Sequence, residues 1–160
     1  MRVISPSLAT SPHASQWLRL TDDGQFELRT GKVELGQGIS AALTQIACET
    51  LGVLPTQVRW VAGDTCASPD EGYTAGSQSI EVGGEAWRHV GHVVRSHFAQ
   101  AAAQHWYGTS ASQLTKSQAA GIAAILPNPR KYKATNSSSY IENRKGKIMR
   151  IMRHSARPEY

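Results

Sequence analysis

The spacing of hydrophobic residues predicts strands first and helices later in the chain. Apolar and polar residues alternate in part over residues 25–35, the pattern of a half-buried strand with a break or bulge at Gly31. The Asp-Gly step just before it, within residues 21–24, is typical of a tight hairpin turn. A short apolar run over residues 58–62 predicts a further strand.

Two longer segments carry their hydrophobic residues at helical spacing. The first follows Gly38 and ends at Gly52, a glycine placed where helices commonly terminate. The second extends roughly from Gly84 to Tyr107, and Gly108 ends it. In chain order these elements predict an α/β fold of the two-layer α+β kind, built as a β-hairpin–α–β–α unit.

Both ends of the chain lack this periodicity. Residues 1–16 are rich in serine and proline and are expected to form a loose leader. After about Leu114 the sequence becomes basic and rich in serine and asparagine, and residues 115–160 are expected to be a disordered or out-of-frame tail. The predicted domain is therefore confined to residues 17–114.

The net charge of +5 is distributed very unevenly. Residues 1–114 hold seven basic and ten acidic residues, a net charge of −3, whereas residues 115–160 hold ten basic and two acidic residues, a net charge of +8. Nucleic-acid binding through this tail is one alternative function, with Tyr132 and Tyr140 available to stack on bases. It is disfavoured because the tail contains no recognisable nucleic-acid-binding motif.

Cysteine usage and hydropathy exclude several classes of protein. Cys48 and Cys66 alone cannot build a disulfide-rich scaffold, a four-cysteine zinc site or an iron–sulfur cluster. No apolar run approaches the roughly 20 residues that span a bilayer. The N-terminus does not resemble a signal peptide. We therefore expect a cytoplasmic location and no membrane partner; a periplasmic one would need an export signal upstream of this sequence.

The strongest local feature is Gly36-Gln37-Gly38, at the predicted junction of a strand and a helix. Glycines let the backbone approach a ligand closely, and the amides at a helix start attract anions. A tight turn without a ligand explains the same residues. A third reading is the dinucleotide-binding pattern GxGxxA, which ends here at Ala41 and would make the chain a Rossmann-like NAD-binding domain. The charged strand before it argues against that reading.

A second loop combines small residues and hydroxyls ahead of the second helix. Its candidate ligand-binding residues are Thr74, Ala75, Gly76, Ser77 and Ser79. Backbone amides and hydroxyl donors in such a loop suit a phosphate or a polar heterocycle, although a solvated loop has the same composition. Two such loops, each ahead of a helix, favour a divided cofactor site.

The other chemically capable residues favour structural roles. His89 and His92 lie three residues apart on the second helix, but no carboxylate or cysteine is placed to complete a metal site. Cys48 falls among apolar helix positions and is expected in the core. Asp64, Asp70 and Glu71 could be acid/base groups, but acidic loop residues are common and none has an apolar setting in the sequence that would raise its pKa. We assign no catalytic residue and no metal ligand.

Taken together, the two loops have a familiar sequence. The segments are TGKVELGQGISAALTQIACETLGV (Thr30–Val53) and GDTCASPDEGYTAGSQSIEVGG (Gly63–Gly84). With the alanine-rich helix behind them, they resemble the start of the molybdopterin-binding region of the xanthine dehydrogenase/aldehyde oxidase family. Large subunits of the isoquinoline oxidoreductase type are the most similar. The resemblance extends over Trp17–Leu114.

This resemblance implies a cofactor, a reaction and partners. Gly36, Gln37 and Gly38 match the family's loop at the molybdopterin, and the second loop matches the one that binds the pterin and its phosphate or cytosine dinucleotide extension. Family members hydroxylate aldehydes or N-heterocycles with oxygen from water. They pass electrons to 2Fe–2S centres, which in the two-subunit type lie on a small subunit.

The chain also departs from the family. Its large subunits are several times longer, and their catalytic glutamate lies far downstream in a motif that this sequence lacks. The sequence therefore predicts a truncated N-terminal part of a molybdenum hydroxylase, missing the remainder of the large subunit and inactive by itself.

Overall fold

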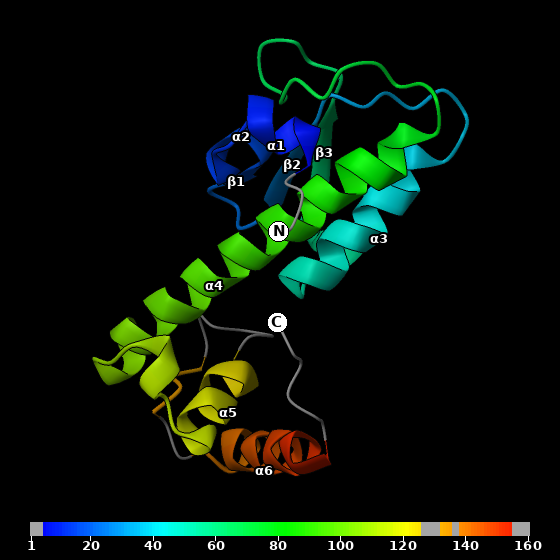
Figure 1. The fold of residues 1–160 in the computed structure, drawn as a ribbon. Helices are drawn as coiled ribbons and strands as arrows, with labels where there is room; N and C mark the ends of the chain where they lie inside the picture. Colours follow the sequence, from blue (N-terminus) through cyan, green and yellow to red (C-terminus); the bar gives the residue numbers. More distant parts are fainter. Residues whose placement is uncertain (1–4, 126–131, 136–137, 155–160) are drawn as a thin grey trace. The chain divides into compact units, whose positions relative to one another are not determined.

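The computed structural model describes residues 5–125, 132–135 and 138–154 (Figure 1). It divides into two compact units, residues 1–96 and residues 97–160. The division falls within the long helix α4 (Glu85–Tyr107). No helix within the described residues is both long enough and apolar enough to cross a bilayer.

The first unit is built around a three-stranded sheet of order β1-β2-β3. β1 (Leu18–Leu20) and β2 (Phe26–Thr30) form the predicted antiparallel hairpin, and β3 (Val58–Ala62) pairs with β2 in parallel. Helix α3 (Ile39–Leu51) and the short 3-10 helix η1 (Pro55–Gln57) connect these parallel strands. The α/β fold is confirmed.

The core of the first unit lies between the sheet and the helices α3 and α4. Leu28 of β2, Leu43 of α3 and Val90 of α4 are almost fully buried there. Two completely buried tryptophans, Trp17 and Trp87, meet edge to face with ring centroids 5.7 Å apart. Such pairs contribute about 0.5–1.5 kcal/mol beyond the area they bury.

The leader is folded rather than loose from Ser5 onward. It forms two short helices, α1 (Pro6–Thr10) and α2 (Ala14–Trp17). Leu8 belongs to the core, and the Ser5 hydroxyl donates a hydrogen bond to the carbonyl of Val82, 2.8 Å away. One apolar side chain and a few polar contacts, too sparse to show a period in the sequence, hold this segment in place.

The predicted strand over residues 25–35 is too long. β2 ends at Thr30, and the chain turns away at Gly31, where a Cβ atom would lie 2.5 Å from the carbonyl oxygen of Pro69. Beyond this point Val33 and Leu35 are exposed, with 43% and 72% of their surface accessible. Their alternation with polar residues therefore reflects an exposed loop and not a half-buried strand.

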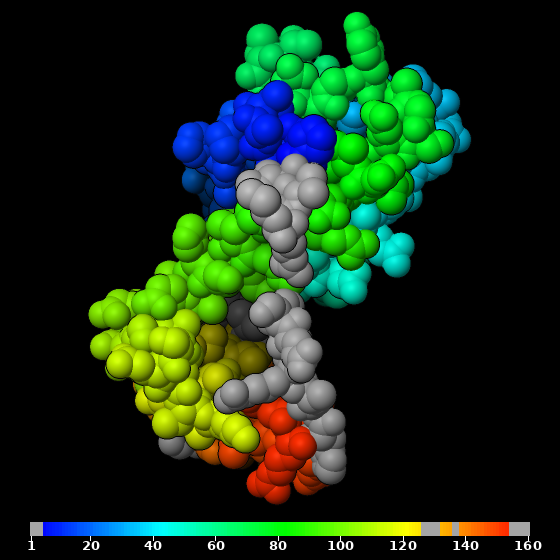
Figure 2. Space-filling model, in the orientation of Figure 1, coloured from blue at the N-terminus to red at the C-terminus, as the bar shows by residue number. Residues whose placement is uncertain are grey.

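The second unit is helical where the sequence analysis expected a disordered tail. It contains the end of α4, the 3-10 helix η3 (Ala111–Gln113), α5 (Lys116–Ile125) and α6 (Ser139–His154). Figure 2 shows α6, coloured orange to red, at the surface of this unit. Its buried residues Ala124, Ile125, Ala134 and Ile141 form a small core of their own. Two of these four residues are alanines, and the four come from separate segments, so the hydrophobic periodicity is weak.

Candidate cofactor-binding site

Two loops meet over one open cavity in the first unit. We call residues 31–38 the first loop and residues 63–78 the second loop. The cavity has a volume of about 400 Å³. It is lined by seven of the eight predicted site residues together with three apolar ones: Gln37, Gly38, Thr74, Ala75, Gly76, Ser77 and Ser79, with Ile39, Ala42 and Ile80. Gly36 does not line it.

The fold explains why these segments meet. The first loop follows β2 and the second follows β3, and these strands are parallel, so both loops lie at the same edge of the sheet (Figure 1). The first loop leads into α3, and the second leads into η2 (Ser79–Gly84), a π-helical turn that continues into α4. Ligands of α/β folds characteristically bind at the carboxyl ends of parallel strands.

The amides of the first loop are occupied by a side chain of the same loop. Glu34 accepts hydrogen bonds from the backbone N–H groups of Gly36 and Gly38, each 2.9 Å away, and from that of Ser40, 3.0 Å away. These bonds hold the pKa of the Glu34 carboxyl below its usual value, so it carries its negative charge at neutral pH. The expectation that these amides are open to an anion is therefore wrong for this conformation.

Gln37 is also engaged within the first loop. Its Oε1 accepts from the Leu35 amide at 2.6 Å, and its Nε2 donates to the Val33 carbonyl at 3.1 Å. Gly36 and Gly38 have φ angles of 94° and 79°, which favour glycine. The loop is thus a self-bonded turn that presents the edge of Gln37 to the cavity.

The second loop has the opposite character. Gly76 and Ser77 both adopt left-handed backbone angles, with φ values of 62° and 57°, and serine rarely does so. Thr74 Oγ1 accepts a hydrogen bond from the Val33 amide at 2.9 Å, which joins the loops. Within the described part of the chain, no hydrogen bond uses the Ser77 hydroxyl or the amides of Gly76 and Ser77. These groups remain available to a ligand.

Glu34 and Lys32 shape this site but are not predicted from the sequence, and the environment of a third residue, Glu71, is predicted wrongly: it is buried. In the sequence, Glu34 was interpreted only as a charged position of the expected strand. A carboxylate just ahead of a helix start is nevertheless a recognisable capping signal. Lys32 and Glu71 are buried beneath the two loops, with 3% and 8% of their surface accessible. Burial raises the pKa of the Glu71 carboxyl, although hydrogen bonds from Thr30 and Gly31 oppose this. No local pattern marks a buried lysine.

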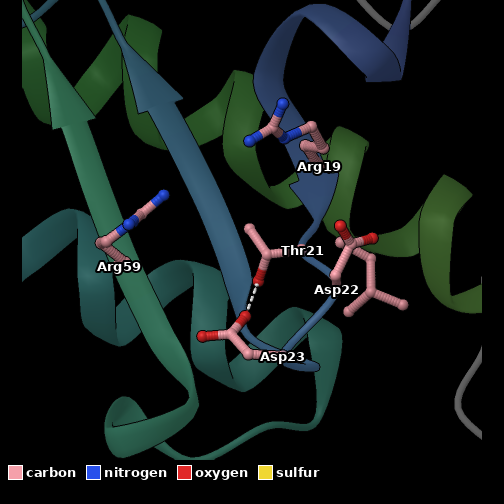
Figure 3. Close-up of a pocket in the computed structure, with 6 residues that line it drawn as sticks. Arg19, Thr21, Asp22, Asp23 and Arg59 are labelled. Atoms are coloured by element: carbon pink, nitrogen blue, oxygen red, sulfur yellow. Dashed lines mark hydrogen bonds between the residues drawn. The ribbon is translucent and has the colours of Figure 1, made fainter.

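A second cavity, on the exposed face of the sheet, is less suited to a ligand. Figure 3 shows Arg19 of β1 and Arg59 of β3 on either side of β2, with Asp22 and Asp23 in the hairpin turn. Both guanidinium groups are paired with Oε2 of Glu27, at 3.5 and 2.5 Å. Asp22 and Asp23 add two further carboxyl groups to the lining of this cavity, which oppose a bound anion, so we do not assign an anion site here.

The remaining candidate residues lie away from the cavity. His89 and His92 are exposed on α4. Cys48 is buried, and burial raises the pKa of its thiol. Asp64 accepts hydrogen bonds from the amides of Cys66 and Ala67 and so closes its own turn. Among the described residues, no group of three or more histidine, cysteine or acidic side chains is arranged to hold a metal ion.

Comparison with known families agrees with the site. The family model described as "Molybdopterin cofactor-binding domain" matches residues 1–147. The chain belongs to this family. The matched residues extend beyond Leu114, where the resemblance was expected to end.

The cavity is compatible with the cofactor of a molybdopterin cofactor-binding domain. Its volume lies within the range of roughly 300–1,000 Å³ typical of small-molecule sites. The unengaged donors of Gly76 and Ser77 suit the phosphate or the polar pterin ring, and Gly38 leaves room for close approach. Molybdopterin is thus the cofactor that the family match and the site jointly support.

Over a shorter stretch, the chain is similar to curated proteins of a different kind. A biosynthetic peptidoglycan transglycosylase of Pseudomonas syringae pv. syringae is 50% identical over 62 residues, which cover 39% of this chain and 26% of the relative. One from Chromohalobacter salexigens is 54% identical over 54 residues, 34% of this chain and 23% of that relative. The chain thus spans about a quarter of the relatives it matches. No solved structure matches the chain.

Proposed function

We propose that the chain supplies molybdopterin-binding loops to a molybdenum hydroxylase of the xanthine dehydrogenase/aldehyde oxidase type. Such enzymes hydroxylate aldehydes or N-heterocycles with oxygen from water. The observation that carries the proposal is the two-loop cavity: seven residues chosen from sequence resemblance line one cavity although they come from segments some 40 residues apart. When bound, the cofactor would supply the redox chemistry.

The two loops would bind different parts of the cofactor. The second loop, with free donors at Gly76 and Ser77, would hold the phosphate or its cytosine dinucleotide extension. The first loop would contribute the Gln37 side chain to the pterin edge, after exchange of one of that side chain's two internal hydrogen bonds. Apolar Ile39 and Ile80 would pack against the ring faces.

We further propose that the chain is inactive alone and works with partners. Gln37, Gly38 and Ala75 to Ser77 are exposed, whereas a bound cofactor normally loses most of its surface to protein. Four large apolar side chains lie on or next to the loops with 43% to 93% of their surface exposed: Val33, Leu35, Tyr73 and Ile80. Such a patch fits docking of the remainder of the large subunit. A 2Fe–2S small subunit would accept the electrons, and the assembly would be cytoplasmic.

The proposal is tested by equilibrium binding of molybdopterin and its cytosine dinucleotide to the purified chain under anaerobic conditions. We expect weak but saturable binding that Ser77→Gly reduces, because this variant removes the hydroxyl and keeps the left-handed backbone. Ser15→Ala, which removes an exposed hydroxyl on α2, is the matched control and should bind like the wild type. Absence of binding at about 1 mM cofactor, equivalent to less than about 4 kcal/mol, would contradict the proposal.

The similarity to the transglycosylases supports a separate proposal about part of the chain. We propose that their similarity lies in the second unit, because its 64 residues correspond in length to the 62 matched ones and it carries the separate, basic composition. The matched stretch covers only 26% of the transglycosylase, so we expect this segment to show no transglycosylase activity by itself. Polymerisation of lipid-linked disaccharide by the chain would overturn that expectation.

A further inference from the structure

Beneath the proposed cofactor site, polar side chains join the two loops from within the protein. We propose that Lys32 and Glu71 are positioning residues for this site: they form a buried clamp that holds the second loop at a fixed spacing from the first. The inference rests on the proposed function for its consequence, cofactor affinity, but the clamp itself can be tested without any ligand.

Lys32 extends from the start of the first loop into the second. Its Nζ donates hydrogen bonds to the carbonyl of Glu71 at 2.6 Å and to that of Tyr73 at 2.9 Å. Its own amide donates to Thr30 Oγ1 at 3.1 Å. The ammonium group therefore connects the end of β2 to two backbone carbonyls of the second loop.

Glu71 makes the reciprocal connection. Its Oε2 accepts a hydrogen bond from the Gly31 amide at 2.8 Å and another from the Thr30 hydroxyl. Its Oε1 is buried, with no hydrogen-bond partner within the described residues. Each loop thus contributes one long side chain that bonds to the backbone of the other. The hydrogen bond between Thr74 and Val33 joins the same two loops.

The contacts between the two loops leave no room for a side chain at Gly31 or Gly83. A Cβ atom on Gly31 would lie 2.5 Å from the Pro69 carbonyl, and one on Gly83 would lie 2.9 Å from Glu71 Oε1. Both glycines therefore allow the loops to approach η2 and each other closely.

Buried polar side chains at such a position lower the stability of the fold unless their hydrogen bonds offset the cost of burial. Burying an ammonium or a carboxyl group is unfavourable, and a methionine would fill similar space without that cost. No residue of 72–78 is buried, so apolar packing does not fix this stretch. Hydrogen bonds join this stretch to the first loop instead: those of Lys32 and Glu71 within the protein, and the Thr74–Val33 bond beside them.

The clamp is tested by measuring the distance between the loops in the full chain. Spin labels at Leu35→Cys and Tyr73→Cys occupy exposed positions outside the cavity, with Cys66 replaced by serine and Cys48 buried. We expect a narrow distance distribution in the parent and a broad one in Lys32→Met. Glu71→Gln, which keeps one acceptor, should fall between them.

A control separates positioning from general loss of stability. Val90→Ala truncates a buried core residue outside both loops and should lower the unfolding temperature with the narrow distribution retained. If Lys32→Met does not fold, Gly83→Ala carries the test, because its methyl group would press on Glu71 Oε1. A folded Lys32→Met or Gly83→Ala variant with the parent's distribution would overturn the clamp.

Cofactor binding by the same variants distinguishes the two proposals. We expect Lys32→Met to weaken molybdopterin binding by about tenfold or more, as loss of charge-assisted hydrogen bonds that set a site commonly does. Val90→Ala should leave the affinity unchanged below its unfolding temperature. If the parent binds no molybdopterin but Lys32→Met broadens the distance distribution, the proposed function fails and the clamp stands. Unchanged affinity in a folded Lys32→Met variant would overturn its positioning role.

Discussion

The two loops of the cavity satisfy their backbone groups in opposite ways. In the first loop, Glu34 and Gln37 accept the hydrogen bonds of four amides between Leu35 and Ser40. In the second loop, Gly76 and Ser77 hold left-handed angles with no such acceptor within the described residues. The first loop already contains an anion, the Glu34 carboxylate, whereas the second loop presents hydrogen-bond donors to solvent.

This difference assigns separate roles to loops that look alike in sequence. Both are rich in glycine and precede helices, so composition favours anion binding at each. Because the Glu34 carboxylate occupies the amides at the start of α3, an incoming phosphate would meet a like charge there. The second loop is the better place for it. The difference between the loops predicts four measurable effects, and the largest concerns the helices that follow them.

The largest effect should come from Gly91→Ala, which tests the shared scaffold. A Cβ atom on Gly91 of α4 would lie 2.6 Å from Thr50 Cβ of α3 and closer still to its hydroxyl. Since overpacking typically costs 1–3 kcal/mol, we expect a loss of about 2–3 kcal/mol in the free energy of unfolding, measured by urea denaturation. Both loops should be disturbed equally, because α3 and α4 follow them.

Two further variants check this explanation. Thr50→Ala combined with Gly91→Ala should recover part of the lost stability, because the colliding hydroxyl is removed. Gly146→Ala in α6, where no atom lies within 4 Å of the added Cβ, should instead stabilise its helix by about 0.5–1 kcal/mol. A neutral Gly91→Ala would show that the helices separate more easily than their packing indicates.

The next largest effect distinguishes the loops by their rigidity. Gly38→Ala places a side chain at a φ of 79° in the self-bonded loop and should destabilise the protein by about 1–2 kcal/mol. Gly76→Ala, at a φ of 62° in the loop with free amides, should cost less because that segment can relax. Thermal unfolding of both variants provides the measurement. Equal losses would mean that the second loop is as constrained as the first.

The sequence predicted the sheet and the two long helices of the first unit, but not the short helices of residues 5–17, the helices after Leu114 or the contacts between elements. The hairpin, α3, β3 and α4 follow from hydrophobic period and glycine placement, which act locally. The predicted strand is too long because Val33 and Leu35 continue the alternation of apolar and polar residues, although both side chains are exposed in the folded protein. The first loop's closure and the Lys32–Glu71 clamp depend on residues brought together by folding, which neither spacing nor composition records.

The dependence of stability on pH should have opposite signs for the carboxylates under the two loops. Glu71 has a raised pKa, so the folded state binds its proton more tightly, and stability falls as pH rises from about 4.5 through the folded-state pKa. Glu34 has a lowered pKa, so its contribution is complete above about 4.5 and is lost as pH falls through the folded-state value. Urea denaturation across this range should show the first trend removed in Glu71→Gln and the second in Glu34→Gln. Matching trends in the two variants would contradict these environments.

The smallest effect concerns where an anion binds. Glu34→Gln keeps an acceptor for the loop amides but removes a negative charge beside the cavity. Glu49→Gln makes the same charge change on an exposed residue in the last turn of α3 and serves as the control. We expect Glu34→Gln to bind inorganic phosphate about threefold more tightly at low salt, a small electrostatic gain that 0.5 M salt should largely screen.

Amide chemical shifts during this titration locate the phosphate directly. The largest changes should fall at Gly76 and Ser77 in the wild type, because these amides have no internal acceptor in the described structure. They should stay there in Glu34→Gln, since the glutamine still occupies the first loop. If the largest changes move to Gly36 and Gly38, Glu34 is instead a displaceable occupant of the anion site, and the first loop holds the phosphate once that carboxylate leaves.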